Sequence, residues 1–190
     1  VRDRELIEIQ RACSLVEKGY NPEITFLAVL KRHNTRFYPM GRDGDRRTGN
    51  CVPGTVIDRA VTMPSLFDFY LFAHGAIQGT SRPTHYYVLH NDSKFTADEI
   101  QQLTYHLCYT YAICTRSVSL VPPVYYAHRV ADRARCHLVD MGVGFEDAAS
   151  ATSGYYGGAG TTTGKQTDDP SSVVRLIKTH DRLDGTMYFM

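Results

Sequence analysis

Residues 67–90 read FDFYLFAHGAIQGTSRPTHYYVLH, and they are the clearest evidence for the class of fold. Phe67–Phe72 and His85–His90 are short aromatic and aliphatic runs, which are typical of buried strands. Between them, two glycines and a proline indicate a turn-rich connection. Two further apolar runs, Ile24–Leu30 and Thr55–Ile57, predict strands upstream of this stretch.

Helices are expected before and after these strands. Apolar residues recur at helical spacing over residues 6–16, and Gly19 is placed to end that helix. Thr96 and Glu99 have the spacing of a capping box and predict the start of a second helix. A third helix is expected at Pro123, because proline fits the first helical turn. Strands that alternate with helices predict an α/β domain, here with a mixed sheet and flanking helices.

The composition is that of a globular protein, with 190 residues, 43% of them hydrophobic and 22% charged. It excludes wholesale disorder, and no uncharged stretch approaches the roughly 18 residues of a membrane span. The five cysteines contain no C-x-x-C pair, which favours free thiols in the cytoplasm or the nucleus. The first residues carry neither an initiator methionine nor a signal peptide, so we expect the sequence to begin inside a longer chain.

The net charge of +1 indicates no partner, but two segments are basic. Residues 26–47 hold six Lys and Arg against two Asp, and residues 116–135 hold four Arg against one Asp. This distribution favours an anionic ligand that is bound at one place. An ordinary solvated surface explains the charges equally well, so charge alone leaves both interpretations open.

Residues 146–172 are rich in Gly, Ser, Thr and Ala. Because such a stretch cannot bury enough apolar surface to order itself, we expect a flexible surface loop there. Apolar residues between positions 173 and 183 indicate a short helix after this loop. The aromatic pair Tyr188 and Phe189 lies so close to that helix that we expect it to pack.

Five short motifs occur in one order along the chain. They are Lys31–His33 (KRH), Ala76–Pro83 (AIQGTSRP), Cys114–Ser119 (CTRSVS), Tyr125–His128 (YYAH) and Met187–Phe189 (MYF). Together they closely resemble the C-terminal part of the PIWI domain of eukaryotic Argonaute proteins, and the insertions and terminal methionine look fungal. The resemblance implies that residues 1–190 are the C-terminal part of a single PIWI domain, with an RNase H-like fold that serves RNA silencing.

The resemblance also implies a nuclease centre in the longer protein. Slicing members of the family cleave RNA complementary to the guide with two metal ions, normally Mg²⁺, and the final metal ligand falls on His128. The other catalytic carboxylates would precede Val1, so this segment alone is expected to be inactive as an endoribonuclease. Without the resemblance, a lone histidine beside arginines would more often be an ordinary surface or phosphate-contacting residue.

Contacts to the guide RNA carry over from the family position by position. Eight positions match residues that hold the backbone of the guide's seed, namely Lys31, Arg32, His74, Gln78, Arg82, Arg116, Ser119 and Tyr125. Arg133 matches the residue that reaches the guide's 5′ phosphate, which the neighbouring MID domain mainly binds. The terminal carboxylate of Met190 is expected close to that pocket. The match fails at Ile113, where related proteins often place an arginine.

Two other interpretations stay open. The chain could belong to an Argonaute that binds guides and acts as a scaffold for silencing partners without slicing, because the upstream carboxylates decide this point. It could also belong to an RNase H-like protein unrelated to silencing, although such a nuclease has no reason to keep the seed-binding positions.

Single residues have ordinary structural interpretations as well: Arg82 could simply cap a turn, and Tyr125 could be an ordinary packed aromatic. The expected partners are a 5′-phosphorylated guide RNA, its target RNA and the MID domain, away from membranes, in the cytoplasm or the nucleus.

Overall fold

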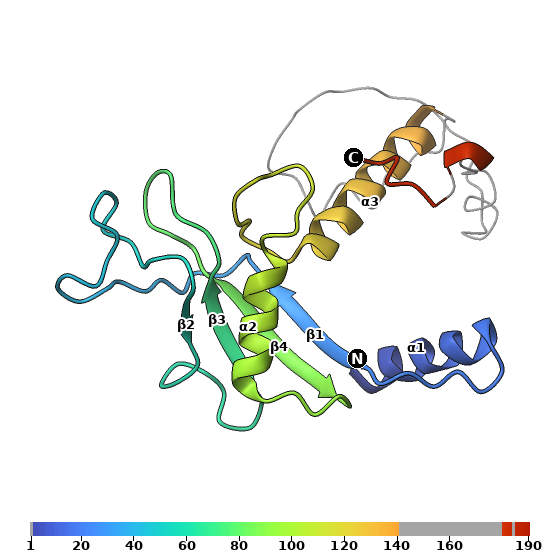
Figure 1. Ribbon diagram of the computed structural model, residues 1–190, viewed down its shortest axis with the longest axis horizontal. Helices are drawn as coiled ribbons and strands as arrows, with labels where there is room; N and C mark the ends of the chain where they lie inside the picture. Colours follow the sequence, from blue (N-terminus) through green and yellow to red (C-terminus); the bar gives the residue numbers. More distant parts are fainter. Residues whose placement is uncertain (1, 141–179, 184) are drawn as a thin grey trace. The chain divides into compact units, whose positions relative to one another are not determined.

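A computed structural model describes residues 2–140, 180–183 and 185–190 of the protein (Figure 1). These residues form two compact units, Val1–Pro122 and Pro123–Met190. The first unit holds α1 (Arg2–Val16), a four-stranded sheet and α2 (Ala97–Leu107). The second unit holds nearly all of α3 (Pro122–Asp140), together with a short 3-10 turn, η2 (Asp181–Leu183).

The sheet is antiparallel and has the strand order β1-β4-β3-β2. Its strands are β1 (Thr25–Leu30), β2 (Thr55–Ile57), β3 (Asp68–Phe72) and β4 (Thr84–Asn91). All four predicted strands are therefore confirmed, with bounds that differ by one residue at most. A mixed sheet would also contain a parallel pair, and none occurs among the described strands. The short connection 73–83 accounts for this at β3 and β4, because neighbouring strands joined by a short loop run antiparallel.

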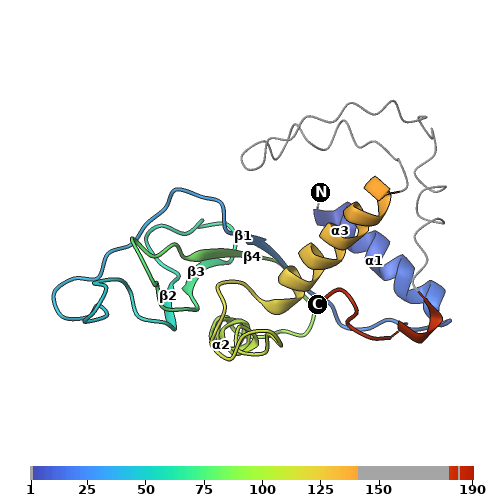
Figure 2. The same cartoon turned by 90° about the horizontal axis from the view of Figure 1, so that it is seen from above.

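One face of the sheet is covered by α2, which lies across it in both views (Figures 1 and 2). Successive residues of a strand point to opposite faces, so Phe69 and Leu71 of β3 share the face that meets Ile100 of α2. Tyr86 of β4 stacks on Phe69 with the ring centroids 5.2 Å apart. This layer is the hydrophobic core of the first unit.

The helix α2 begins at the capping box that the sequence predicts. The Thr96 N–H donates to Oε2 of Glu99 at 2.8 Å, and the Glu99 N–H donates to Oγ1 of Thr96 at 3.3 Å. These two bonds satisfy backbone donors that have no partner inside the helix. They fix where the helix starts, and Ile100 then faces the sheet.

The opposite face of β3 is covered by the chain that follows β1. Phe37 packs edge-to-face on Tyr70 and Phe72, with ring centroids 5.1 and 6.2 Å apart. His33 packs on Tyr70 in the same manner at 5.5 Å. Because β3 is thus buried on both faces, its sequence is almost continuously apolar rather than alternating.

The single charged residue of β3, Asp68, is buried together with a partner. Its Oδ2 lies 2.5 Å from Nε2 of His85, and its Oδ1 accepts the Met63 N–H at 2.8 Å. The His85 ring lies between the rings of Tyr70 and Tyr87, at centroid distances of 3.9 and 4.0 Å. These hydrogen bonds explain how a carboxylate is accommodated in the middle of the sheet.

The last residues of the chain pack against α3 in the second unit. The rings of Tyr126 and Phe189 lie 6.1 Å apart, and the guanidinium of Arg133 lies 5.8 Å above the centre of the Tyr188 ring. The predicted packing of the terminal aromatic pair is therefore confirmed. The predicted loop at 146–172 lies outside the described residues. So does most of the predicted short helix, of which η2 is the described part.

The helix α1 is largely exposed and ends shortly before Gly19, as the sequence predicts. Gly19 has a φ of +88°, a conformation that glycine adopts readily after the end of a helix. No helix in the described ranges combines the length and the apolar character that crossing a membrane requires.

Candidate nucleic-acid interface

The predicted RNA-binding residues of the first unit lie at one end of the sheet. β1 ends and β4 begins there, with Leu30 paired to His85. The segment after β1 and the loop 73–83 therefore leave the sheet at the same end (Figure 1). The segment before α3 joins them, because Oγ1 of Thr84 donates to the carbonyl oxygen of Ser119 at 2.5 Å.

Lys31 connects the first two of these segments. Its Nζ donates to the carbonyl oxygen of Arg82 at 2.6 Å and to Oγ1 of Thr84 at 3.3 Å. Burial, helped by the neighbouring guanidinium groups of Arg82 and Arg36, lowers the pKa of the Lys31 ammonium to about 8. Lys31 thus holds the backbone of Arg82, and its contact to a guide stays a prediction.

Two histidines beside Lys31 share its environment. Burial lowers the pKa of His74, and the charge of Lys31 lowers it further. Burial also lowers the pKa of His33, although its 3.0 Å hydrogen bond to the carbonyl of Pro83 acts in the opposite direction. Both imidazoles are therefore neutral at pH 7, and they can meet RNA as hydrogen-bonding groups rather than as charges.

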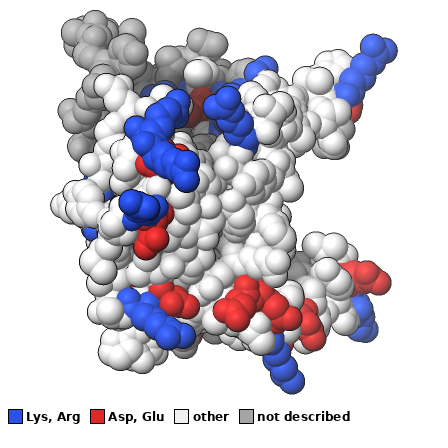
Figure 3. Space-filling view, turned by 60° about the vertical axis from the view of Figure 1, so that its left-hand side comes forward, with Lys and Arg blue, Asp and Glu red and all other residues white. Residues whose placement is uncertain are grey.

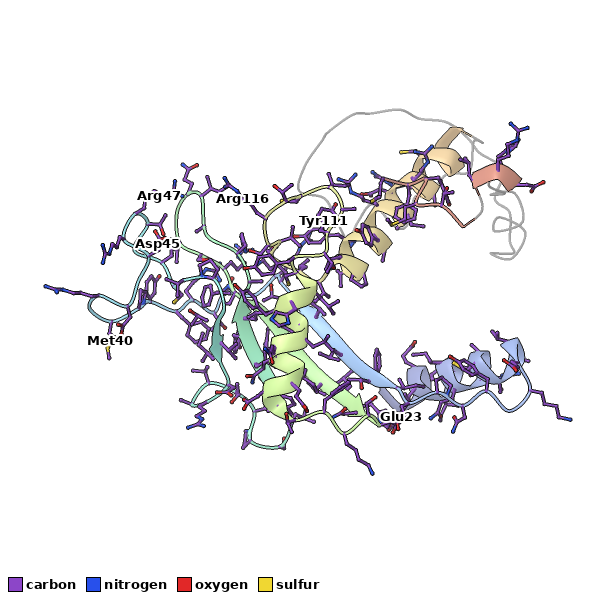
Figure 4. All side chains as sticks on the ribbon, in the orientation of Figure 1. Glu23, Met40, Asp45, Arg47, Tyr111 and Arg116 are labelled. Atoms are coloured by element: carbon purple, nitrogen blue, oxygen red, sulfur yellow. The ribbon has the colours of Figure 1, made fainter. Side chains whose placement is uncertain are left out.

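The other predicted residues of this unit lie nearer the surface. Four of them are exposed and Ser119 is half-buried; the exposed ones are Arg32, Gln78, Arg82 and Arg116. Arg116 lies at the same end of the unit as Arg47 (Figure 4). The space-filling view shows Lys and Arg side chains at the surface, with Asp and Glu side chains among them (Figure 3). Exposed guanidinium groups at one end of this unit suit a polyanion held by its phosphates.

Three predicted residues lie on α3, in the second unit. Tyr125 is half-buried, whereas His128 and Arg133 are exposed. Arg133 is held over the ring of Tyr188. The exposed Met190 donates its backbone N–H within the terminal turn at 3.1 Å. The roles predicted for these residues at the 5′ phosphate and at a metal ion stay predictions.

A metal centre needs several ligands close together. Across residues 2–140, 180–183 and 185–190, no three His, Cys, Asp or Glu side chains are grouped so that they could hold a metal ion. The carboxylate nearest to His128 in the sequence is Asp132, which lies 4.0 Å from the guanidinium of Arg135. These residues do not fit a Mg²⁺ centre by themselves, and His128 would supply a single ligand.

Two further residues organise this end of the sheet in a way that the sequence did not indicate. Thr84 is fully buried and links Lys31 to the carbonyl of Ser119. Arg36 donates to two backbone carbonyls of its own segment, at 3.0 and 2.7 Å, and so fixes its course after β1. A threonine after a proline carries no special signal in a sequence. Arg36 was visible only as one of six basic residues within 26–47.

Comparison with protein families identifies the fold. Residues 1–139 match the family described as the Piwi domain. The chain belongs to the Piwi domain family. Its fold class, an RNase H-like α/β fold with a sheet and flanking helices, is thereby confirmed, as is the predicted resemblance to the C-terminal part of an Argonaute.

Curated relatives of this Piwi domain include Argonautes of rice, Oryza sativa subsp. japonica. Protein argonaute 11 is 53% identical over 152 residues, which cover 78% of this chain. Protein argonaute MEL1 is 46% identical over 188 residues, which cover 97% of it. The chain spans 17% of the length of either relative. Because both are plant proteins, they give no support to the predicted fungal source.

Two solved structures from yeasts resemble the Piwi domain over nearly its whole length. The C-terminal lobe of a budding yeast Argonaute matches 98% of this chain and 36% of its own, with a TM-score of 0.75 and 30% identity. The Kluyveromyces polysporus Argonaute with a guide RNA matches 98% of this chain and 21% of its own, with a TM-score of 0.73 and 30% identity.

Proposed function

We propose that this Piwi domain binds a small 5′-phosphorylated guide RNA within a longer Argonaute, and that the guide directs cleavage of complementary RNA. The observation that carries the proposal is the cluster at the end of the sheet. There the pKa values of Lys31, His33 and His74 are each lowered by burial and by neighbouring cationic groups. A bound polyanion favours the charged forms that this environment disfavours. The yeast Argonaute that was solved with a guide RNA supports the same class of ligand.

The exposed residues around this cluster suit contacts to a sugar–phosphate backbone. Arg32, Arg82 and Arg116 would pair with phosphate oxygens, since a guanidinium presents several N–H donors to them. Gln78 and Ser119 would donate hydrogen bonds to phosphate or ribose oxygens. None of these contacts reads a base edge, so the same surface would hold guides of any sequence.

The second unit would carry the contacts to the 5′ end and one part of the nuclease centre. Tyr125 would hold the backbone of the seed, and Arg133 would reach the 5′ phosphate, which the MID domain of the same protein would mainly bind. The terminal carboxylate of Met190 would lie close to that phosphate pocket. His128 would contribute this chain's one ligand to Mg²⁺, and the remaining ligands would come from outside the described residues. Because His128 would touch no part of the guide, its loss should remove cleavage and spare guide binding.

The test uses the full-length protein, because the relatives are several times longer than this chain. Wild type, His128→Ala and the control Asp132→Asn are loaded with a 5′-phosphorylated guide RNA in Mg²⁺, and guide retention and target cleavage are scored separately. We expect His128→Ala to retain its guide without cleaving, and the control to do both. A wild type that retains its guide but never cleaves would instead favour a non-slicing scaffold. Failure to retain the guide would refute the proposal.

We propose the cytoplasm as the place of action, with the nucleus second. All five cysteines are free thiols, and unpaired thiols suit a reducing compartment. The partners would be the target RNA and further proteins of the silencing machinery. Fluorescence microscopy of the tagged full-length protein tests the location, and accumulation in the secretory pathway would contradict it.

A further inference from the structure

The loop 73–83 is clasped by a side chain from a different loop. Asn50 lies in the connection between β1 and β2, with only 7% of its surface exposed. Its Nδ2 donates to the carbonyl oxygen of Gly79 at 2.9 Å, and its Oδ1 accepts the N–H of Ser81 at 2.8 Å. One amide therefore holds the loop on both sides of Thr80, and both of its polar atoms are used.

Asn50 is itself held in place by the turn that precedes it. Its carbonyl oxygen accepts the Asp45 N–H at 2.8 Å. The Asp45 carboxylate accepts the backbone N–H groups of Arg47 and Thr48 at 2.9 and 2.8 Å. These bonds fix the backbone of residues 45–50, so the side-chain amide of Asn50 is held in a defined position.

The clasped loop carries two of the residues proposed to bind the guide. Gln78 and Arg82 are exposed on either side of the clasp, whereas Ser81 is only 4% exposed. Gly79 has a φ of +68°, so the loop turns sharply at the clasp. The other support of the loop is the bond from Lys31 to the carbonyl of Arg82. Without the clasp, the part around Gln78 and Gly79 would lose the side-chain anchor from the 45–50 turn.

We propose that Asn50 is a positioning residue, which touches no RNA but preorganises the loop 73–83 for binding the guide backbone. This inference rests on the proposed guide binding. A loop that is already ordered loses less conformational freedom when the RNA binds, so its affinity is higher. Removing both bonds of the clasp should weaken guide binding by about tenfold, on the scale of net hydrogen-bond contributions.

The experiment measures the Kd for a 5′-phosphorylated guide RNA at several salt concentrations in the full-length protein. The variants are Asn50→Ala, Arg82→Ala and the double variant. The matched control is Asn91→Ala, because Asn91 makes the same pair of amide bonds to Phe95, donating at 2.8 Å and accepting at 3.3 Å. Asn91 ends β4 at the opposite end of the sheet, away from the proposed RNA-binding residues of the first unit.

We expect Asn50→Ala to weaken binding by about tenfold and Asn91→Ala to leave it unchanged. Since Asn50 would act through the loop that bears Arg82, the double variant should lose less than the product of the two single losses. A fully additive double variant, or wild-type affinity in Asn50→Ala, would overturn the inference. If Arg82→Ala also binds as the wild type does, guide binding at this loop is itself wrong, so the two failures are distinguishable.

A second measurement uses the wild-type protein alone, so it does not depend on whether a variant folds. Hydrogen exchange of the wild-type protein without RNA reports whether the loop is ordered before binding. The Ser81 N–H should exchange slowly, because it is bonded to Asn50 and buried. If this amide exchanges in the free protein as fast as an unprotected backbone amide, the loop is not preorganised.

Discussion

Nζ of Lys31 donates a 2.6 Å hydrogen bond to the carbonyl oxygen of Arg82, so the chain after β1 is tied to the loop between β3 and β4. The two residues are 51 positions apart in the sequence. The bond turns the Lys31 ammonium toward the protein and leaves the Arg82 side chain exposed. Lys31 thus supports the backbone of Arg82, rather than binding a phosphate group beside the Arg82 side chain.

The pKa of Lys31 tests this arrangement directly. It should be about 8, because burial and the neighbouring guanidinium groups of Arg82 and Arg36 disfavour the charged form. Arg82→Ala should raise it toward the ordinary value of 10.5, without restoring that value, because burial is the larger cause. The measurement is the pH dependence of acylation at Lys31, in the wild type and in Arg82→Ala. A pKa of 10.5 for Lys31 in the wild type would contradict the environment described.

The same pKa has a consequence for stability. Between pH 8 and 10.5 the unfolded state binds more protons at Lys31 than the folded state does, so stability contributed by this residue rises with pH over that window. Below pH 8 the ammonium is charged in both states, and the contribution stays constant. Urea denaturation at pH 8 and pH 10, with Lys31→Met as the reference, isolates this effect. A difference between the two proteins that does not change with pH would count against it.

Thr84→Val should destabilise the first unit by about 1–3 kcal/mol. The substitution keeps the shape of the side chain but removes the hydroxyl between Lys31 and the Ser119 carbonyl, at a position with no solvent exposure. Thr110→Val is the control, because the exposed Thr110 hydroxyl also donates to a carbonyl, that of Leu107 at 2.8 Å. Its cost should be about 0.5 kcal/mol or less. Equal costs by urea denaturation would show that burial of the hydroxyl is unimportant.

Asp68→Ala should cost about 3–5 kcal/mol, because it leaves His85 in the sheet without its partner. Asp92→Ala offers the matched comparison, since Asp92 lies 2.7 Å from Nε2 of His90 in a partly exposed pair. That pair should contribute much less than the buried one, because solvent screens it. Thermal unfolding of the two variants in one background measures both values, and a cost below that of Asp92→Ala would mean that the buried pair is dispensable.

Local patterns predicted most of the elements in the first unit. Aromatic and aliphatic runs located the four strands, and Thr96 with Glu99 located the start of α2, because these signals act within a few residues. The buried pair of Asp68 and His85 could not be predicted, since the two residues are 17 positions apart and no periodicity links them.

The sequence predicted residues that the structure places together at the end of the sheet, but not what each of them contacts. The motif match named Lys31, His74 and Arg82, and they do lie at one end of the sheet. It could not indicate that Lys31 supports the loop or that His74 is neutral at pH 7, because burial and neighbouring charges fix those properties. Asn50 was missed for a similar reason, since its partners Gly79 and Ser81 are brought near only by the fold.

The most direct test of the account is the affinity for a guide when two exposed arginines are removed from the end of the sheet. Arg82→Ala/Arg116→Ala and the control Arg59→Ala are compared in the full-length protein across a salt series, since Arg59 is 94% exposed and lies outside the proposed site. We expect a higher Kd for the double variant. Its slope of log K against log salt should be smaller by about 1.4, or about 0.7 for each lost phosphate contact. The control should bind as the wild type does. A double variant with the affinity and salt slope of Arg59→Ala would contradict guide binding at this surface.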